Sequence, residues 1–159
     1  MNAILMLVRI QGPLMHQVPS DPSLAVIAGD FDGFTPESLF DHFTQPELLT
    51  KWWNPIAEID LKPGGKYVFQ WPQQGWTLRG EYLAVEPARH LAFTWAWDHG
   101  LQGYEPLRVD LWMDRIHEVG ARLGIFHGPF ELTEADQVTK QGVAEGWIHF
   151  CMRLRGLGQ

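Results

Sequence analysis

The segment LLTKWWNPIAEIDLKPGGKYVFQW, from Leu48 to Trp71, contains two adjacent tryptophans followed by an Asn-Pro pair and, further on, by Pro-Gly-Gly. Tryptophan has a large apolar surface and is rarely buried completely, so the pair either fills a core or lines a cavity. Proline disfavours helical backbone at the residue before it, so a helix that contains Trp52 and Trp53 ends there. Beyond Pro55 the apolar residues change to a period of two, which predicts strands.

Two short helices are expected before this stop, after a first strand over residues 23–31. Thr35 is a candidate N-cap, with Pro36 at the first helical position. Thr44 and Pro46 repeat the pattern for the second helix, which runs to Trp53. Both helices have an apolar face at helical spacing, formed by Leu39, Phe40 and Phe43 in the first and by Leu48, Leu49, Trp52 and Trp53 in the second.

Several antiparallel strands are expected after Pro55. Pro63-Gly64-Gly65 predicts a hairpin turn, because glycine accepts positive φ without steric cost. The sets of residues predicted to face inward are Tyr67, Phe69 and Trp71; Leu91, Phe93, Trp95 and Trp97; Leu107, Val109, Leu111 and Met113; and Leu123, Ile125 and His127.

Two positions in these strands allow more than one interpretation. In the segment GEYLAVEP, either Tyr82 and Ala84 or Leu83 and Val85 face inward, and the pattern does not decide between them. Trp112 interrupts an otherwise polar outer face. It either contacts a second copy in a homodimer or marks a β-bulge that changes the strand register.

A long amphipathic helix is predicted from about Ala135 to Leu154, with one apolar stripe made of Val143, Trp147, Phe150, Cys151 and Leu154. The stripe must pack on a large apolar surface. The pattern therefore predicts an α+β fold, in which a curved antiparallel sheet wraps around the long C-terminal helix and two short helices follow the first strand. Residues 1–22 form an N-terminal extension, and residues 23–156 form one domain.

Composition excludes several classes of function. The net charge is −7 and no cluster of basic residues occurs, so a nucleic-acid partner is not expected. The one cysteine, Cys151, cannot form an internal disulfide, which favours a reducing cytoplasm. The N-terminal apolar run is too short to span a membrane and lacks the features of a signal peptide. No motif typical of a nucleotide, metal or other cofactor site is found, so neither a metal nor a cofactor is expected.

Four motifs occur in a characteristic order: FDHFTQPELLTKWWNP, DLKPGGKYVFQW, GEYLAVEPARHLAFTWAW and EGWIHFCMRL. Together they resemble the SRPBCC (START-like) superfamily, in particular its AHSA-like branch, named after an activator of a heat-shock chaperone ATPase. The resemblance covers residues 24–154 and implies a helix-grip fold with a deep apolar cavity between sheet and helix. It departs from the family pattern at Asn54, where glycine is usual.

The resemblance implies that the protein binds a hydrophobic, lipid-like or polyketide-like small molecule. Two alternatives are an enzyme, such as a cyclase or hydrolase, that acts on such a molecule, and a co-chaperone that stimulates a heat-shock ATPase. The inward His127 is the candidate for a proton-transferring residue. The candidate ligand-binding residues are Trp52, Trp53, Tyr67, Phe69, Trp71, Phe93, Trp95, Leu111, Ile125, His127 and Trp147.

Overall fold

The computed structural model describes residues 13–100 and 105–158 of the 159-residue chain. The strands are β1 (His16–Gln17), β2 (Ala25–Asp32), β3 (Ile56–Ile59), β4 (Lys66–Trp71), β5 (Trp76–Glu86), β6 (His90–Trp97), β7 (Leu107–His117) and β8 (Gly120–Gly128). The helices are α2 (Pro36–Thr44), α3 (Pro46–Leu49) and α4 (Glu134–Gly156).

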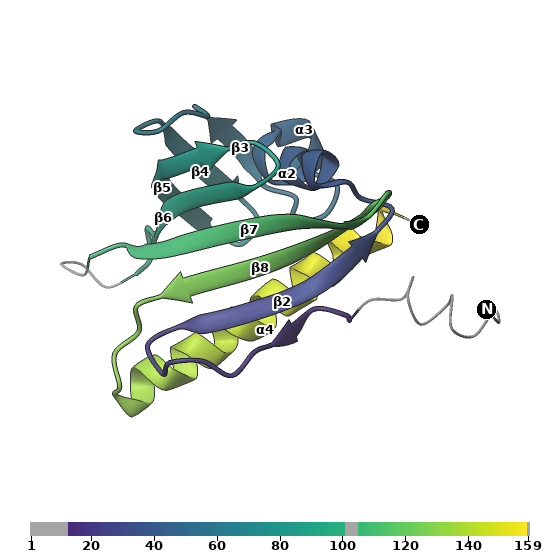
Figure 1. The fold of residues 1–159 in the computed structure, drawn as a ribbon. Helices are drawn as coiled ribbons and strands as arrows, with labels where there is room; N and C mark the ends of the chain where they lie inside the picture. The colour runs from purple at the N-terminus through teal and green to yellow at the C-terminus, as the bar shows by residue number, and fades with distance from the viewer. Residues whose placement is uncertain (1–12, 101–104, 159) are drawn as a thin grey trace.

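These strands form one antiparallel sheet in the order β1-β2-β8-β7-β6-β5-β4-β3. The sheet curves around α4, which runs along its inner face, while α2 and α3 lie at the end of the fold near β3 (Figure 1). The predicted α+β helix-grip fold is therefore confirmed. The core lies between the inner face of the sheet and the helices.

The side-chain alternation of the central strands agrees with the sequence pattern. Val109, Leu111 and Met113 of β7 are buried, and Leu111 lies opposite the equally buried Ile125 of β8. Arg108, by contrast, is exposed on the outer face. Because alternate residues of a strand point to opposite faces, one apolar set faces the helix and one polar set faces solvent.

A β-bulge explains why the pattern of β5 was ambiguous. The register between β5 and β6 shifts between Tyr82 and Ala84, so Leu83 is an extra residue in the strand. Tyr82 is buried before the bulge, Leu83 is exposed, and Val85 packs against the core after it. The first of the two predicted inward sets is therefore correct before the bulge, at Tyr82, and the second is correct after it, at Val85.

Trp112 lies on the outer face of β7 and is partly exposed. It pairs in regular register with His90 and Gly124, and the irregularity of β7 lies between Arg115 and His117. The bulge interpretation of Trp112 is therefore wrong. Its indole stacks on the His90 ring, with the ring centroids 3.8 Å apart. Contact of Trp112 with a second copy stays a prediction.

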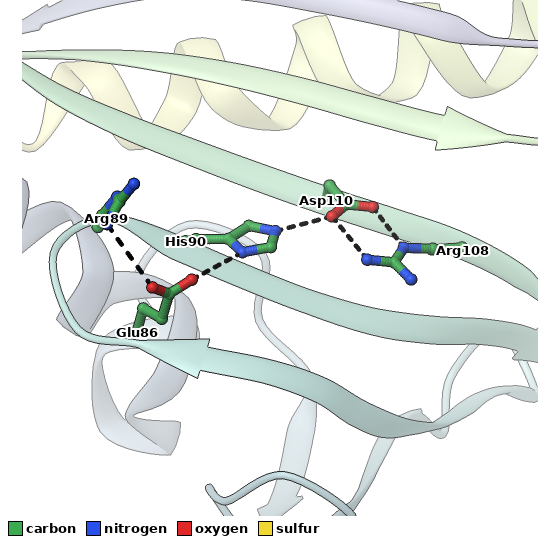
Figure 2. A network of polar contacts seen from close by, with 5 residues as sticks. All are labelled: Glu86, Arg89, His90, Arg108 and Asp110. Carbon is green, nitrogen blue, oxygen red and sulfur yellow. Dashed lines mark hydrogen bonds and ion pairs between the residues drawn. The ribbon is translucent and has the colours of Figure 1, made fainter.

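His90 also joins a polar network on this outer face (Figure 2). Its Nε2 lies 2.7 Å from Asp110 Oδ2, its Nδ1 lies 3.1 Å from Glu86 Oε2, and Arg108 donates to Asp110. Burial acts to raise the pKa of Asp110, but hydrogen bonds from Arg108 and His90 outweigh it and hold the pKa below its ordinary value. The network links β5, β6 and β7, which indicates a structural role.

The first short helix begins as the sequence predicts, whereas the second differs. Thr35 caps α2, because its side chain accepts a hydrogen bond from the Ser38 amide. Thr44 is not the N-cap of α3: it ends α2 and donates its hydroxyl to the Phe40 carbonyl. The N-cap of α3 is Gln45, and this helix ends at residue 49, so Trp52 and Trp53 lie in the turn that follows it.

The backbone at Asn54 ends the turn that contains the two adjacent tryptophans, whose rings stack with their centroids 5.5 Å apart. Asn54 has a φ of 63°, in the left-handed region that glycine and asparagine tolerate best. This geometry explains why asparagine replaces the glycine usual in the resembled family. Trp52 is completely buried and donates its indole N–H to the His42 carbonyl, and Phe43 packs edge-on against it.

The segment before the first predicted strand is integrated into the fold. Residues 16–17 form the edge strand β1, which pairs with β2. Met15 is buried in the main core, and the amide of Asp30 donates to the Pro13 carbonyl. A Cβ on Gly29 would lie within 3 Å of Met15 atoms, so this close approach requires glycine. No pattern in the sequence indicated this packing, because the segment is short and irregular.

Helix α4 extends slightly beyond its predicted bounds. Thr133 is its N-cap and accepts from the Asp136 amide. Trp147, Cys151 and Leu154 of the predicted stripe are buried, whereas Val143 and Phe150 are only partly buried. No helix in the described part of the chain is long and apolar enough to cross a membrane.

The left-handed backbone at residue 54 gives a test of the fold. We expect Asn54→Gly to change the free energy of unfolding little, and Asn54→Val to lower it by about 1–2 kcal/mol, because a β-branched residue is strained there. Lys51→Val, at an exposed position without positive φ, is the matched control. Denaturant unfolding measures all three, and equal stability of the two valine variants would contradict the explanation.

Candidate functional site

A cavity of about 980 Å³ opens between α4, the turn after α3, the β4–β5 hairpin and the end of β6. This volume is at the upper end of the range typical of small-molecule pockets. Its lining residues are Thr50, Trp53, Asn54, Pro55, Ile56, Trp71, Pro72, Gln73, Gln74, Trp76, Trp95, Trp97, Thr139, Gly142, Val143, Gly146, Trp147, His149, Phe150 and Arg153.

Three tryptophans from distant parts of the chain form the inner wall. Trp53, Trp95 and Trp147 are each less than 10% exposed. The ring centroid of Trp53 lies 6.0 Å from that of Trp95 and 5.6 Å from that of Trp147, and the last two are 5.5 Å apart. The rings hold one another in place, so this wall is a rigid aromatic surface.

Three further tryptophans extend this wall toward solvent. Trp71 donates its indole N–H to the Trp53 carbonyl at 2.9 Å, which ties β4 to the turn after α3. Trp97 packs against Trp71 and, edge-on, against Trp95. Trp76 is 47% exposed and reaches the rim. The aromatic surface is therefore continuous from the buried floor to the mouth.

Two glycines of α4, the helix that also carries Trp147, form a further part of the cavity lining. Gly142 and Gly146 line the cavity, and a Cβ built on either would meet no atom within 4 Å. These glycines are followed by His149 and Arg153 at intervals of four, three and four residues, so all four positions lie on one stripe of the helix. Glycine inside a helix costs about 1 kcal/mol relative to alanine, so these positions lower helix stability and leave free volume in the cavity.

Four of the residues predicted to bind a ligand line this cavity: Trp53, Trp71, Trp95 and Trp147. The other predicted residues do not line it. They lie in the packed core, at Trp52, Tyr67, Phe69, Phe93, Leu111, Ile125 and His127. Tyr67 is an example: its ring packs against that of Tyr82, and burial raises the pKa of both phenols.

His127 lies behind the cavity wall. Its Nδ1 accepts a hydrogen bond from the Trp147 indole at 3.0 Å, which leaves the proton of the neutral ring on Nε2. Nε2 has no hydrogen-bond partner within the described structure. Burial lowers the pKa of His127 to about 3, because the imidazolium would be desolvated. The residue holds Trp147 in its orientation.

The rim supplies polar groups that the sequence analysis did not single out. His149 and Arg153 of α4 are exposed but line the mouth, as do Gln73 and Gln74 of the β4–β5 turn. The helical stripe shared by Gly142 and Gly146 could have indicated the two α4 residues. Nothing in the local pattern of the turn indicated its glutamines, because their place depends on how the hairpin meets α4.

The described residues show no other reactive group at the cavity. No cluster of three or more histidine, cysteine, aspartate or glutamate side chains suited to a metal ion occurs among them. Burial raises the pKa of Cys151 far above its ordinary value, so the thiol stays protonated at neutral pH. The arrangement is suited to holding an apolar molecule by contact rather than to nucleophilic chemistry.

Comparisons with solved structures give the same fold. A protein from Mesorhizobium loti matches with a TM-score of 0.69 and 24% identity over 83% of this chain and 95% of that one. An HSP90 activator from Plasmodium falciparum matches with a TM-score of 0.69 and 19% identity, over 85% and 95%. A protein of the dynemicin biosynthetic locus matches with a TM-score of 0.70 and 15% identity, over 86% and 46%.

These identities are low, so the structural matches show the fold alone. A comparison with curated protein sequences gave no match. The model of the family described as "Activator of Hsp90 ATPase homolog 1-like protein" matches residues 34–158, which is most of the chain and includes every element that lines the cavity. The chain therefore belongs to this family, the AHSA-like branch of the SRPBCC superfamily.

Proposed function

We propose that this protein binds a hydrophobic, ring-containing small molecule in the cavity between α4 and the β4–β6 side of the sheet. The observation that carries the proposal is the pairing of a rigid wall formed by Trp53, Trp95 and Trp147 with the bare helix surface at Gly142 and Gly146. A flat apolar molecule fits between such surfaces, because aromatic rings stack in offset or edge-on contact.

The energetics of α4 support this interpretation. Alanine at residue 142 or 146 would find open space and would stabilise the helix by about 1 kcal/mol each. A purely structural helix would gain from those methyl groups. A helix that must leave room for a ligand would not, which favours binding as the function of the cavity.

The solved structures with this fold are compatible with more than one function. One protein with this fold belongs to the dynemicin biosynthetic locus, and another is an HSP90 activator. Their TM-scores are nearly equal, so the fold does not distinguish small-molecule from co-chaperone functions. We favour small-molecule binding because the cavity has the volume of a ligand pocket and an aromatic lining. We also expect the protein to act in the cytoplasm, given its single buried cysteine.

An enzyme acting on such a molecule is the second hypothesis, and the site gives it less support. His127, the candidate for proton transfer, does not line the cavity and has a pKa lowered to about 3. A general base at neutral pH needs a pKa near 7 and a direct approach to the substrate. No aspartate or glutamate occurs among the lining residues in the described ranges 13–100 and 105–158. Ligand binding therefore accounts for the lining residues without a general base, which catalysis would require.

The proposal predicts that a side chain at residue 146 blocks the cavity. We expect Gly146→Leu to weaken binding of the neutral fluorescent probe N-phenyl-1-naphthylamine at least about tenfold, because the leucine side chain occupies the space of the ligand. The free energy of unfolding should rise or stay equal, because leucine is a better helix former than glycine. Probe titration and denaturant unfolding measure the two effects. Gly156→Leu is the control, because this last residue of α4 also has open space around its Cβ but does not line the cavity. Unchanged probe binding by Gly146→Leu would contradict the proposal.

The buried histidine predicts a pH dependence of stability. Below about pH 6.5 the unfolded chain takes up a proton at His127, whereas the folded chain takes it up only near pH 3. The free energy of unfolding therefore falls as pH decreases through this window, by up to about 1.4 kcal/mol per pH unit from this group.

The variant His127→Gln isolates this contribution, because glutamine can still accept from the Trp147 indole but does not titrate. We expect the stability advantage of the wild type over the variant to shrink as pH is lowered from 6.5 to 4, measured by urea unfolding. His16→Gln, at an exposed histidine of β1, serves as the control. Parallel pH profiles of the wild type and His127→Gln would show that burial does not suppress protonation of His127.

A further inference from the structure

We infer that the ligand of this cavity is an acid, whose apolar rings pack against the tryptophan wall beside Gly146 and whose anionic group binds Arg153 at the rim. The inference rests on the proposed function and narrows it from hydrophobic molecules in general to amphipathic anions. It follows from the charge of the lining residues, the contacts of Arg153 and the geometry of α4.

The lining of the cavity differs in charge from the rest of the protein. The chain has 19 acidic and 12 basic residues, not counting histidine, and a net charge of −7. Among the described residues that line the cavity, none is acidic, and Arg153 is the only lysine or arginine. His149 lies beside it on the same helix. An acidic protein that keeps carboxylates away from its cavity provides a local environment suited to an anion.

Arg153 is also available for a ligand. Its guanidinium lies over the Phe150 ring, 6.0 Å from the centroid, and it makes no ion pair with any carboxylate in the described part of the chain. Other exposed arginines are engaged: Arg79 bonds to Asp98, and Arg122 bonds to a buried carboxylate. The planar guanidinium is suited to binding a carboxylate or sulfonate by two parallel hydrogen bonds.

Helix geometry sets the length of the expected ligand. Gly146 and Arg153 are seven residues apart on one stripe of α4, so their backbones are about 10 Å apart along the helix axis. The Arg153 guanidinium lies over the Phe150 ring, so this distance is an upper limit for the separation of rings and acid. The rings would pack beside Gly146 against Trp147 and Trp53, and the acid would lie one molecular length away at the mouth. Two or three fused or linked rings with one acidic group match this distance.

A cationic ligand is the main alternative, because tryptophan rings attract ammonium groups. The lining supplies no carboxylate to balance such a cation, and Arg153 would repel it. The observations therefore favour the anion, and the test below includes a probe that separates charge from ring contacts.

Two fluorescent probes with the same ring skeleton provide the test. 8-Anilinonaphthalene-1-sulfonate is anionic, and N-phenyl-1-naphthylamine lacks the sulfonate. We expect Arg153→Gln to weaken binding of the sulfonate at least about tenfold and to change binding of the neutral probe less than about twofold, because only the charge-assisted hydrogen bonds are lost. Arg153→Lys keeps the charge but not the two parallel hydrogen bonds, so it should restore only part of the sulfonate affinity.

The control variant is Arg89→Gln, which removes one exposed positive charge on the β5–β6 turn, away from the cavity. It should leave both probes unaffected. If the neutral probe binds but Arg153→Gln leaves sulfonate affinity unchanged, or weakens both probes equally, the acid inference is overturned and the proposed function stands. If neither probe binds the wild type, the proposed function and the inference fail together.

Discussion

The left-handed backbone at Asn54 is the constraint on which the rest of the site depends. It ends the turn after α3, in which the rings of Trp52 and Trp53 stack with their centroids 5.5 Å apart. Trp52 fills the core beneath α2, whereas Trp53 turns to the cavity and stacks against Trp95 and Trp147. The backbone of Trp53 in turn anchors the Trp71 indole. The turn that Asn54 ends thus connects the short helices, the hairpin and the long helix through the contacts of Trp53.

Helix α4 has two faces with opposite demands on packing. On one side Cys151 and Leu154 are buried against the sheet at close-packed density. On the other, Gly142 and Gly146 leave open space and lower the intrinsic stability of the helix. Packing of the first face stabilises the position of the helix, so the second face can lack side chains at its two glycines. His127 contributes from behind by fixing the Trp147 indole, at the expense of burying an unpaired Nε2 proton.

The fold could be predicted from the sequence almost completely, because alternation in β7 and β8 and the stripe on α4 are strong periodic signals. The site could be predicted only in part. Alternation showed that Trp95 and Phe93 face inward, and both are buried. Only Trp95 lines the cavity. Which inward residue reaches the cavity depends on its position along the strand relative to α4, and alternation does not give that position. The bulge at Leu83 and the packing of Met15 also depend on tertiary contacts. The two glycines of α4 that line the cavity, Gly142 and Gly146, were the sequence signal that the analysis missed.

The eight tryptophan indoles provide the most direct test of the central claim, because each gives its own proton–nitrogen NMR signal. Titration with N-phenyl-1-naphthylamine should shift the indole signals of Trp53, Trp95 and Trp147, assigned by single substitutions to phenylalanine. The signals of Trp52 in the core and Trp112 on the outer face should stay unchanged. Shifts confined to Trp112, or no shifts at probe saturation, would contradict the account of a ligand cavity between α4 and the sheet.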